Sequence, residues 1–166
     1  MEYFDVLDKD RNFLNKTYVR GTKLNEEEFN AGVEIFITSN NKLLLSQRCL
    51  LKSHPLEWEA QGGCVVAGDN SIKTVHKELQ EEIGLTLKED PKFITTDLYK
   101  NQFVDIYTID LKENSNNFTL QEEEVNDIKW VDEEEFKEMV KQNQIVASVL
   151  NRFQKVKNEL NLNWKL

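Results

Sequence analysis

Hydrophobic and polar residues follow two different periods along this chain, and the first of these periods predicts β-strands near the N-terminus. The segments EYFDVLD and FLNKTYVRG are rich in strand-forming residues and flank the polar sequence KDRN. The runs GVEIFIT and KLLLSQR are also rich in strand formers and flank the turn-forming sequence SNN. The pattern therefore predicts two β-hairpins, of which the first precedes the main body of the chain.

A helical period begins at Ser71. Apolar residues recur there at steps of three and four positions, which places them on one face of a helix: Ile72, Val75, Leu79 and Ile83. Gly84 supplies a stop signal at the C-terminal end. The cap at the N-terminal end is expected from one of three neighbouring residues, Asp69, Asn70 or Ser71.

The remaining segments complete a mixture of strands and helices. FITTDLYK and QFVDIYTIDL predict strands, and DIKWV predicts a shorter one. LKSHPLEWEAQGG has a proline, a glycine pair and no clear period, so it predicts a loop, as does NSNNF. DEEEFKEMVKQ and IVASVLNRFQKVKNEL predict two closing helices. This order of elements indicates a layered α/β domain with a mixed sheet.

The charge of the chain excludes two classes of partner. Its 30 acidic and 21 basic residues give a formal net charge of −9. Nucleic-acid polymers and anionic membranes are bound through basic surfaces, so neither is expected as a partner. An anionic small molecule would need a metal cation between itself and this protein.

Cysteine content and hydropathy indicate a cytoplasmic protein. Cys49 and Cys64 are the only cysteines, and their spacing matches neither a disulfide framework nor a zinc site. The N-terminal sequence MEYFDVLDKDR has no secretory signal, and the apolar run at residues 43–45 is far too short to span a bilayer. We expect one domain, because 166 residues suffice to bury a core.

Three glutamates share one face of the predicted helix. Glu78, Glu81 and Glu82 stand at i, i+3 and i+4, where like charges cost a few tenths of a kcal/mol per pair. A solvated acidic face is the simplest explanation of such a cluster. Alternatively, a hard divalent cation such as Mg²⁺ or Mn²⁺ replaces this repulsion with attraction to the carboxylate oxygens.

The sequence around these glutamates has a longer pattern, Gly63-x5-Asp69-x7-Lys77-Glu78-Leu79-x-Glu81-Glu82-x-Gly84-Leu85. It resembles the signature box of the Nudix hydrolase family, G-x5-E-x7-R-E-U-x-E-E-x-G-U, in which U is a bulky aliphatic residue. Every spacing agrees. Two positions differ conservatively, since Asp69 replaces a glutamate and Lys77 replaces an arginine. A match of this length is far more specific than a lone glycine motif.

The resemblance implies the α/β/α sandwich of the Nudix family, with a mixed sheet and an N-terminal β-hairpin extension. The extension would be residues 1–28 and the core residues 29–131, with the box at 63–85. Residues 132–166 would form the C-terminal helices. The segments RGTKLNEEEFNAGVEIFI and LKSHPLEWEAQGG are also similar to Nudix proteins related to isopentenyl-diphosphate isomerase.

The resemblance also implies roles for the box residues. Glu81 and Glu82 would be the principal metal ligands, and Glu78 a further ligand or the group that activates water. The main-chain carbonyl of Gly62 is another expected ligand. Lys77 would orient the carboxylates, although a lysine lacks the planar fork of arginine. Asp69 is one methylene shorter than the family residue, and capping the helix is its alternative role.

Further site residues are expected outside the box. Family members often take another carboxylate from the loop before a strand that carries a tryptophan. In QEEEVNDIKWV this is expected to be Glu124, with Glu123 and Glu122 as the next candidates. Three residues could contact the substrate: Arg48, Lys52 and Trp58. The alternative role is a salt bridge at the rim of the site for Arg48 and for the more mobile Lys52, and a packing anchor for Trp58.

The expected function is Mg²⁺-dependent hydrolysis of a diphosphate linkage in a nucleoside di- or triphosphate or a related derivative. One alternative is isopentenyl-diphosphate isomerase-like chemistry, but Gly62 stands near the position of the isomerase cysteine and Cys64 where a histidine would be. A second alternative is a Nudix module that binds nucleotides or a partner without turnover. The closing helices could also form a homodimer, and no feature of the sequence decides between monomer and dimer.

Overall fold

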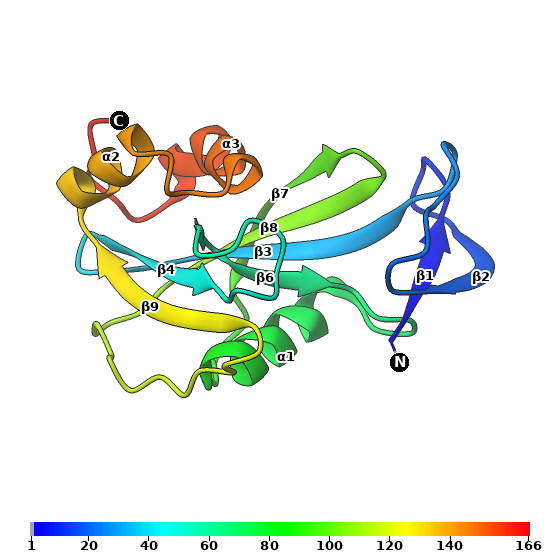
Figure 1. The fold of residues 1–166 in the computed structure, drawn as a ribbon, viewed down its shortest axis with the longest axis horizontal. Coiled ribbons are helices and arrows are strands. Elements are labelled where there is room, and N and C mark those ends of the chain that lie inside the picture. Colours follow the sequence, from blue (N-terminus) through cyan, green and yellow to red (C-terminus); the bar gives the residue numbers. More distant parts are fainter. Residues whose placement is uncertain (1) are drawn as a thin grey trace.

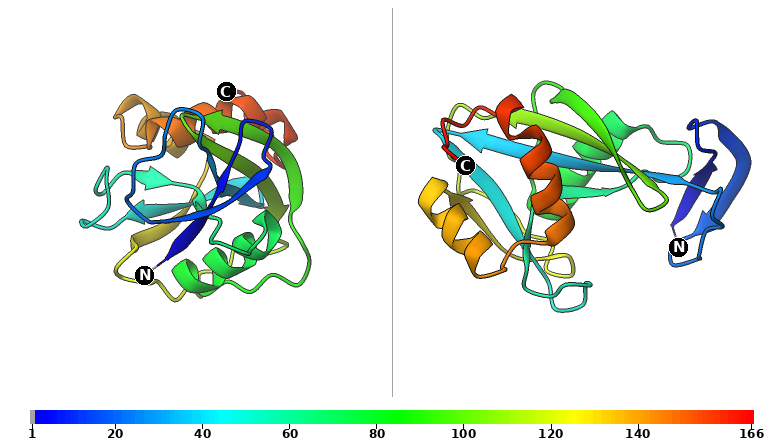
Figure 2. Two further views of the ribbon diagram at one scale, coloured as in Figure 1. Left: turned by 90° about the vertical axis from the view of Figure 1, so that its right-hand side faces the viewer. Right: turned by 90° about the horizontal axis from the view of Figure 1, so that it is seen from above.

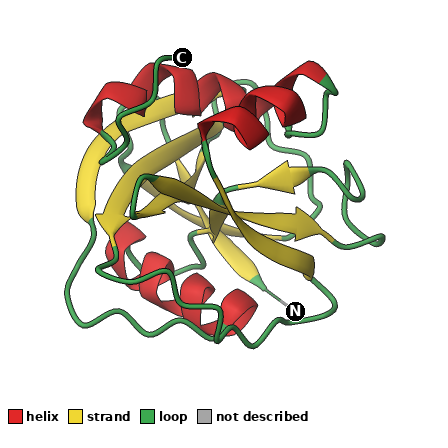
Figure 3. Cartoon of the chain, turned by 90° about the vertical axis from the view of Figure 1, so that its left-hand side faces the viewer, coloured by secondary structure: helices red, strands yellow, loops and turns green. Residues whose placement is uncertain are grey.

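A seven-stranded sheet lies between two layers of helices in the computed structural model, which describes residues 2–166 (Figure 1). Helix α1 (Ser71–Ile83) covers one face, and α2 (Glu133–Lys141) with α3 (Ala147–Val156) covers the other (Figure 3). A short 3₁₀ turn, Lys157–Glu159, follows α3. The strands are β3 (Asn30–Ser39), β4 (Lys42–Arg48), β5 (Trp58–Glu59), β6 (Gln61–Cys64), β7 (Lys92–Tyr99), β8 (Gln102–Asp110) and β9 (Val125–Val131). The predicted α/β/α sandwich is confirmed.

The sheet is mixed and divides into two parts. Strands β3 and β8 pair in parallel, and the other pairs are antiparallel. Strands β3 and β4 pair only beside their connecting turn, at Thr38–Leu43 and Ser39–Lys42. Beyond that point β6 pairs with β3, whereas β5 and β9 flank β4. The two parts therefore separate from each other, and the space between them holds the site described below.

The turn between β3 and β4 is the predicted hairpin. Asn40 and Asn41 have φ values of 48° and 60°. Asparagine tolerates this left-handed region, and two such residues match the twist of the flanking strands. The polar SNN sequence therefore brings two buried apolar strands side by side.

The helix predicted from Ser71 is also confirmed, and its ends are now defined. The Asn70 side chain accepts a hydrogen bond from the Lys73 main-chain nitrogen, so Asn70 is the cap among the three candidates. Gly84 ends the helix with a φ of 69°, a conformation that costs glycine little. The apolar stripe is buried against the inward residues of β3, and together they form one core: Val75, Leu79 and Ile83 with Val33, Ile35 and Ile37.

The opposite face of the sheet carries a second core beneath α2 and α3. Phe153 of α3 packs its ring 4.6 Å from that of Phe136 on α2 and 5.8 Å from that of Phe36 on β3. These three phenylalanines are among the largest fully buried side chains. The two closing helices are thus fixed against the sheet by aromatic packing. Among residues 2–166, no helix combines the length and the apolar content needed to cross a lipid bilayer.

The prediction of a loop over LKSHPLEWEAQGG is wrong in the second half of this segment, where β5 and most of β6 lie. The glycine pair suggested a loop, but both glycines lie inside β6. A Cβ atom at Gly62 would come within 2.2 Å of the Val33 carbonyl oxygen, and one at Gly63 within 2.3 Å of the Glu78 carboxyl group. The two glycines are required because β6 lies very close to β3 and to α1.

The N-terminal hairpin, β1 (Tyr3–Leu7) and β2 (Phe13–Val19), forms a separate two-stranded sheet at one end of the molecule (Figure 2). Arg11 in its turn holds Asp105 of β8 through two hydrogen bonds of 2.7 and 2.9 Å. Asp105 also accepts hydrogen bonds from the hydroxyl groups of Ser71 and Thr96. Burial opposes ionisation of Asp105, but these bonds outweigh it and lower the pKa of its carboxyl group.

Replacing Asp105 with asparagine is expected to lower the free energy of unfolding by about 2 kcal/mol, since buried hydrogen bonds to a charged group are lost. Urea denaturation at pH 7 measures this change. Glu2→Gln is the control, because its ion pair with Arg20 is exposed. The stabilisation is present at pH 7 and is lost as the pH falls through the lowered pKa of Asp105. Equal urea midpoints for Asp105→Asn and the wild type would contradict this role.

Candidate active site

The three box glutamates lie beside a cavity of about 120 Å³ between α1, β6 and the loop before β9. We call it the acidic cavity. The expected metal ligands all contribute to its lining: Gly62, Glu78, Glu81, Glu82 and Glu124. The fold therefore brings Glu124, which lies 42 positions after Glu82 in the sequence, to the same place as the helix glutamates. Their roles as metal ligands stay predictions.

Two of these glutamates are withdrawn from solvent. Glu82 is only 6% exposed, and burial raises its pKa to about 8 even though Lys52 favours its ionised form. Burial also raises the pKa of Glu78, to about 7, and the neighbouring charge of Glu81 adds to this effect. Glu81 itself is exposed. Glu82 is therefore buried and Glu78 half-buried, and the pKa values of both carboxyl groups lie well above that of a solvated glutamate.

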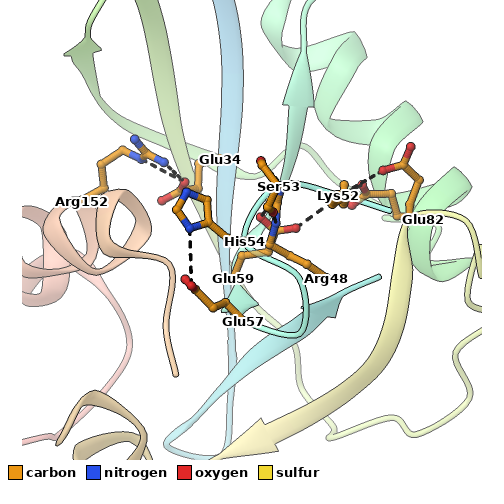
Figure 4. A network of polar contacts seen from close by, with 10 residues as sticks. Glu34, Arg48, Lys52, Ser53, His54, Glu57, Glu59, Glu82 and Arg152 are labelled. Atoms are coloured by element: carbon orange, nitrogen blue, oxygen red, sulfur yellow. Dashed lines mark hydrogen bonds and ion pairs between the residues drawn. The ribbon is translucent and has the colours of Figure 1, made fainter. Parts of the chain in front are cut away.

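Lys52 reaches into the acidic cavity from the loop at residues 49–57 (Figure 4). Its ammonium nitrogen lies 2.8 Å from Glu124 Oε2, 3.4 Å from Glu82 Oε1 and 3.6 Å from a Glu59 oxygen. Burial opposes the charge on Lys52, but these carboxylates outweigh it and raise its pKa. The predicted substrate contact is therefore placed among the carboxylates, where its charge partly compensates theirs.

The acidic cavity fits a hard divalent ion in the chemistry of its donors. Carboxylate oxygens and a main-chain carbonyl are the ligands that Mg²⁺ and Mn²⁺ prefer. Within residues 2–166, however, no three His, Cys, Asp or Glu side chains converge closely enough to enclose a metal ion as they stand. Lys52 bridges Glu82 and Glu124 instead. Convergence on an ion would require the Lys52 ammonium group to move away.

Metal uptake is expected to release protons, because a carboxylate must be ionised to bind. Adding excess Mg²⁺ to the unbuffered protein at pH 7 should liberate on the order of one proton per chain, given the raised pKa values of Glu78 and Glu82. A pH-stat titration measures this release. Repeating it at pH 9.5 provides the control, since both groups are then already ionised. Absence of release at pH 7 would contradict the expectation.

Two box positions lie outside the lining of the acidic cavity. Lys77 is half-buried on α1 and does not line the cavity, so its orienting role stays a prediction. Its charge still favours the ionised form of Glu78. Asp69 forms an ion pair with Lys73 one turn along α1 and does not line the acidic cavity. It is not the helix cap either.

The two glutamates predicted as alternatives to Glu124 lie outside the acidic cavity. Glu122 and Glu123 are exposed, and neither lines it. The main-chain oxygen of Glu123 accepts a hydrogen bond of 2.8 Å from the Cys49 thiol, which fixes the loop against the end of β4. Of the three neighbouring glutamates, only Glu124 therefore has its side chain beside the helix carboxylates.

A second cavity of about 490 Å³ adjoins the first. It lies between the separated parts of the sheet and α3, and we call it the large cavity. Residues of β6 line both cavities: Gly62, Gly63 and Cys64. Arg48, one of the predicted substrate contacts, lines the large cavity, and its guanidinium group is ion-paired with Glu59 and donates to Ser53 (Figure 4). It thus also forms the salt bridge expected as its alternative role.

Trp58, the third predicted substrate contact, is a packing anchor. It is only 7% exposed, belongs to the core beneath α2 and α3, and lines neither cavity. The Lys129 ammonium group lies 4.4 Å from the centre of its ring. Its amphipathic ring therefore serves the alternative role, which is to hold β5 against the core.

Sequence reasoning missed a buried ion pair at the base of the large cavity. Arg152 donates to Glu34 Oε2 from Nε at 2.9 Å and from Nη2 at 2.5 Å, across 118 positions of sequence (Figure 4). Burial raises the pKa of Glu34 to about 7, although Arg152 favours its ionised form. A signal was present in each segment, because Glu34 interrupts an apolar strand and Arg152 stands on the buried stripe of α3.

Most of the chain is similar in sequence to known proteins. A family model described as NUDIX domain matches residues 28–152, more than half of the chain. Nudix hydrolase 3 of Arabidopsis thaliana is 31% identical over 153 residues, which are 82% of this chain and 20% of that protein. This chain thus spans about a fifth of that relative. An uncharacterised Nudix hydrolase of Listeria innocua is 27% identical over 163 residues and is covered over 96% of its length.

Solved structures show the same fold at low sequence identity. DR0079 from Deinococcus radiodurans has a TM-score of 0.75 at 15% identity, over 91% of this chain and 98% of that one. The NUDIX domain of Shewanella oneidensis NrtR, complexed with ADP ribose, has a TM-score of 0.63 at 19% identity, over 86% and 93%. A bifunctional NMN adenylyltransferase/ADP ribose pyrophosphatase from Francisella tularensis, complexed with AMP and a Mn ion, has a TM-score of 0.67 at 15% identity, over 79% and 42%.

Proposed function

Because this chain belongs to the Nudix hydrolase family, we propose that it hydrolyses a diphosphate linkage in a nucleoside di- or triphosphate or a related nucleoside diphosphate derivative. The observation that carries this proposal is the pair of adjoining cavities. The acidic cavity has the size and donors for a hydrated ion with phosphate oxygens, and the large cavity has room for an organic group. The shared residues Gly62–Cys64 lie where the two halves of such a substrate would meet.

The charges in the two cavities support this division. Among residues 2–166, five glutamates but only two basic residues, Arg20 and Lys52, line the acidic cavity. A phosphate group would be repelled there unless a cation lay between it and the protein. In the large cavity, by contrast, Glu34 and Glu59 are each paired with an arginine. The diphosphate would therefore bind through metal in the acidic cavity, and the organic group would occupy the large one.

The residues that would hold the ion are Glu78, Glu81, Glu82 and Glu124, with the Gly62 carbonyl. A divalent ion bound there polarises phosphoryl oxygens and lowers the pKa of a bound water. Glu78 packs against Gly63, beside the shared edge of the two cavities, and would accept a proton from the attacking water. Lys52, once displaced from Glu82 and Glu124, would place its ammonium group near the phosphate oxygens.

The ligands named for two structural neighbours help to choose substrates. The Shewanella domain was crystallised with ADP ribose, and the Francisella enzyme with AMP and a Mn ion. Those ligands belong to those proteins, and at such sequence identities the likeness extends to the fold alone. They nevertheless make adenosine diphosphate derivatives a sensible starting point for this chain, with Mg²⁺ and Mn²⁺ as the metals to supply.

A substrate panel tests the proposed function. The protein is incubated with Mg²⁺ or Mn²⁺ and with nucleoside di- and triphosphates, nucleotide sugars, dinucleotides, ADP-ribose and isopentenyl diphosphate, and the products are separated by chromatography. We expect metal-dependent cleavage of at least one nucleotide substrate. Isomer formation from isopentenyl diphosphate would favour the isomerase-like alternative. Tight nucleotide binding without turnover would favour a non-catalytic module, and either result would overturn the proposal.

A further inference from the structure

We propose that Glu34 and Arg152 determine which organic group the large cavity accepts, and that they recognise a neutral group with a hydrogen-bond donor beside an acceptor. This inference rests on the proposed function. It narrows the substrate class to molecules that carry a hydrogen-bond donor beside an acceptor in the organic group attached to the diphosphate. Two parts of a nucleoside diphosphate derivative have this chemistry: the vicinal diol of ribose and the hydrogen-bonding edge of a base. An isoprenoid diphosphate has neither.

The two side chains form an ion pair at the base of the large cavity. Glu34 of β3 is 5% exposed and Arg152 of α3 is 7% exposed. Both hydrogen bonds from Arg152 go to the same oxygen, Oε2 of Glu34. The parallel arrangement that arginine and carboxylate groups often adopt would have used both oxygens. Here one oxygen of the carboxylate is left over.

The remaining oxygen is a buried acceptor with an unused bonding capacity. Glu34 Oε1 has almost no solvent-accessible area and receives no hydrogen bond from any of residues 2–166. Within the same range, Arg152 Nη1 donates to no acceptor. Buried polar groups in folded proteins are nearly always partnered, and an unpartnered one lowers stability. The pair therefore offers one acceptor and one donor to a ligand.

The position of the pair connects it with the diphosphate site. Glu34 lies directly opposite Gly62 in the pairing of β3 with β6. Gly62 lines both the acidic and the large cavity. A substrate whose phosphates lie in the acidic cavity would therefore extend past Gly62 and reach Glu34 and Arg152 with the group next to its diphosphate.

The charges of the cavity favour a neutral polar group. An anion would meet Glu34, and a cation would meet Arg152. An apolar chain would cover Glu34 Oε1 without supplying the missing donor. Of the other charged groups that line this space, Arg48 and Glu59 are paired with each other, and the Lys100 ammonium group lies 5.3 Å from the centre of the Tyr99 ring. A ligand with a donor for Glu34 and an acceptor for Arg152 satisfies both groups at once.

Glu34→Gln tests the inference because it changes hydrogen-bonding capacity with little change in shape. The amide oxygen can still accept from Arg152, whereas the amide nitrogen replaces the free acceptor with a donor. We expect KM for the substrate identified by the panel to rise about 10- to 100-fold, and kcat to change much less. Asp97→Asn is the matched control, since Asp97 also pairs with α3, through Lys155, but does not line the large cavity.

A binding measurement independent of turnover accompanies the kinetics. Calorimetric titration with the parent nucleoside, which carries no phosphate and needs no divalent metal, should show weaker binding to Glu34→Gln than to the wild type and to Asp97→Asn. Analogues that lack the 2′- and 3′-hydroxyl groups, or that carry another base, show which part of the nucleoside supplies the donor. An analogue that already lacks the relevant donor should bind wild type and Glu34→Gln equally.

Failure of this inference is distinguishable from failure of the proposed function. If the wild type cleaves no diphosphate in the panel, the proposed function fails. If it does cleave a nucleotide, while Glu34→Gln keeps the wild-type KM and affinity, the inference alone is overturned. Cleavage of isopentenyl diphosphate in preference to nucleotides would also overturn it. Should Glu34→Gln fail to fold, Arg152→Lys retains the charge opposite Glu34, lacks the second donor nitrogen, and is expected to raise KM in the same way.

Discussion

Replacing both Glu81 and Glu82 by glutamine is expected to lower metal-dependent hydrolysis by more than about 100-fold. Mutating a residue that only supports a metal ligand already lowers metal affinity or activity by about 10- to 100-fold. Both side chains line the acidic cavity, and glutamine offers one neutral oxygen in place of a carboxylate. The loss should appear in kcat/KM at saturating Mg²⁺. Activity close to that of the wild type would reject the assignment of these two glutamates.

The same double variant is expected to remain folded. Burial raises the pKa of Glu82 to about 8 in the folded protein, so its ionised form opposes folding. In metal-free buffer the free energy of unfolding of the wild type should therefore fall as the pH rises from about 4.5 through about 8. The double variant lacks the Glu82 carboxyl group and should not show this contribution to the fall. Urea midpoints at pH 5 and pH 8.5 measure the difference. Glu122→Gln with Glu123→Gln is the matched control, because both side chains lie outside the acidic cavity.

Gly63→Ala is expected to lower kcat by about 100-fold, because a displacement of roughly 1 Å at a reacting group can have this effect. The added Cβ would lie 2.3 Å from the Glu78 carboxyl group, which must move away from the cavity edge. The carboxyl group is the end of a flexible side chain, so the free energy of unfolding should change little. Unchanged kcat in Gly63→Ala would contradict the role of Glu78 at that edge.

Gly62→Ala provides the contrast to Gly63→Ala. There the added Cβ would meet the Val33 main-chain oxygen at 2.2 Å, and a backbone atom within the sheet cannot easily move aside. We expect the free energy of unfolding to fall by about 1–3 kcal/mol through disturbed pairing of β3 and β6. Measuring kcat and urea denaturation on both variants separates the effect on the site from the effect on the fold.

Local patterns were sufficient to predict most of the elements. The helix at Ser71–Ile83 follows from its apolar spacing and Gly84, and the hairpin of β3 and β4 follows from β-rich runs around two asparagines. Strands β5 and β6 were missed because glycines normally indicate loops. The need for Gly62 and Gly63 arises from the close approach of β3 and α1, which is a property of the assembled fold.

Apart from Glu124, which the family resemblance supplied, the candidate site was predictable only where its residues are close in sequence. The spacing of Glu78, Glu81 and Glu82 placed them on one helix face, and the structure puts all three beside one cavity. The pairing of Glu34 with Arg152 joins segments 118 positions apart, and no local period could reveal it. Lys52 was expected either to contact a phosphate or to form a salt bridge, and its loop brings it to Glu124 and Glu82.

The most direct test of the proposed metal site is a Mn²⁺ titration of the wild type and the Glu81→Gln/Glu82→Gln variant, followed by electron paramagnetic resonance of the free ion. If the acidic cavity holds the ion, the wild type binds Mn²⁺ and the variant binds it at least about 10-fold more weakly, while the Glu122→Gln/Glu123→Gln control matches the wild type. Equal Mn²⁺ affinity in all three proteins would contradict a metal site in the acidic cavity.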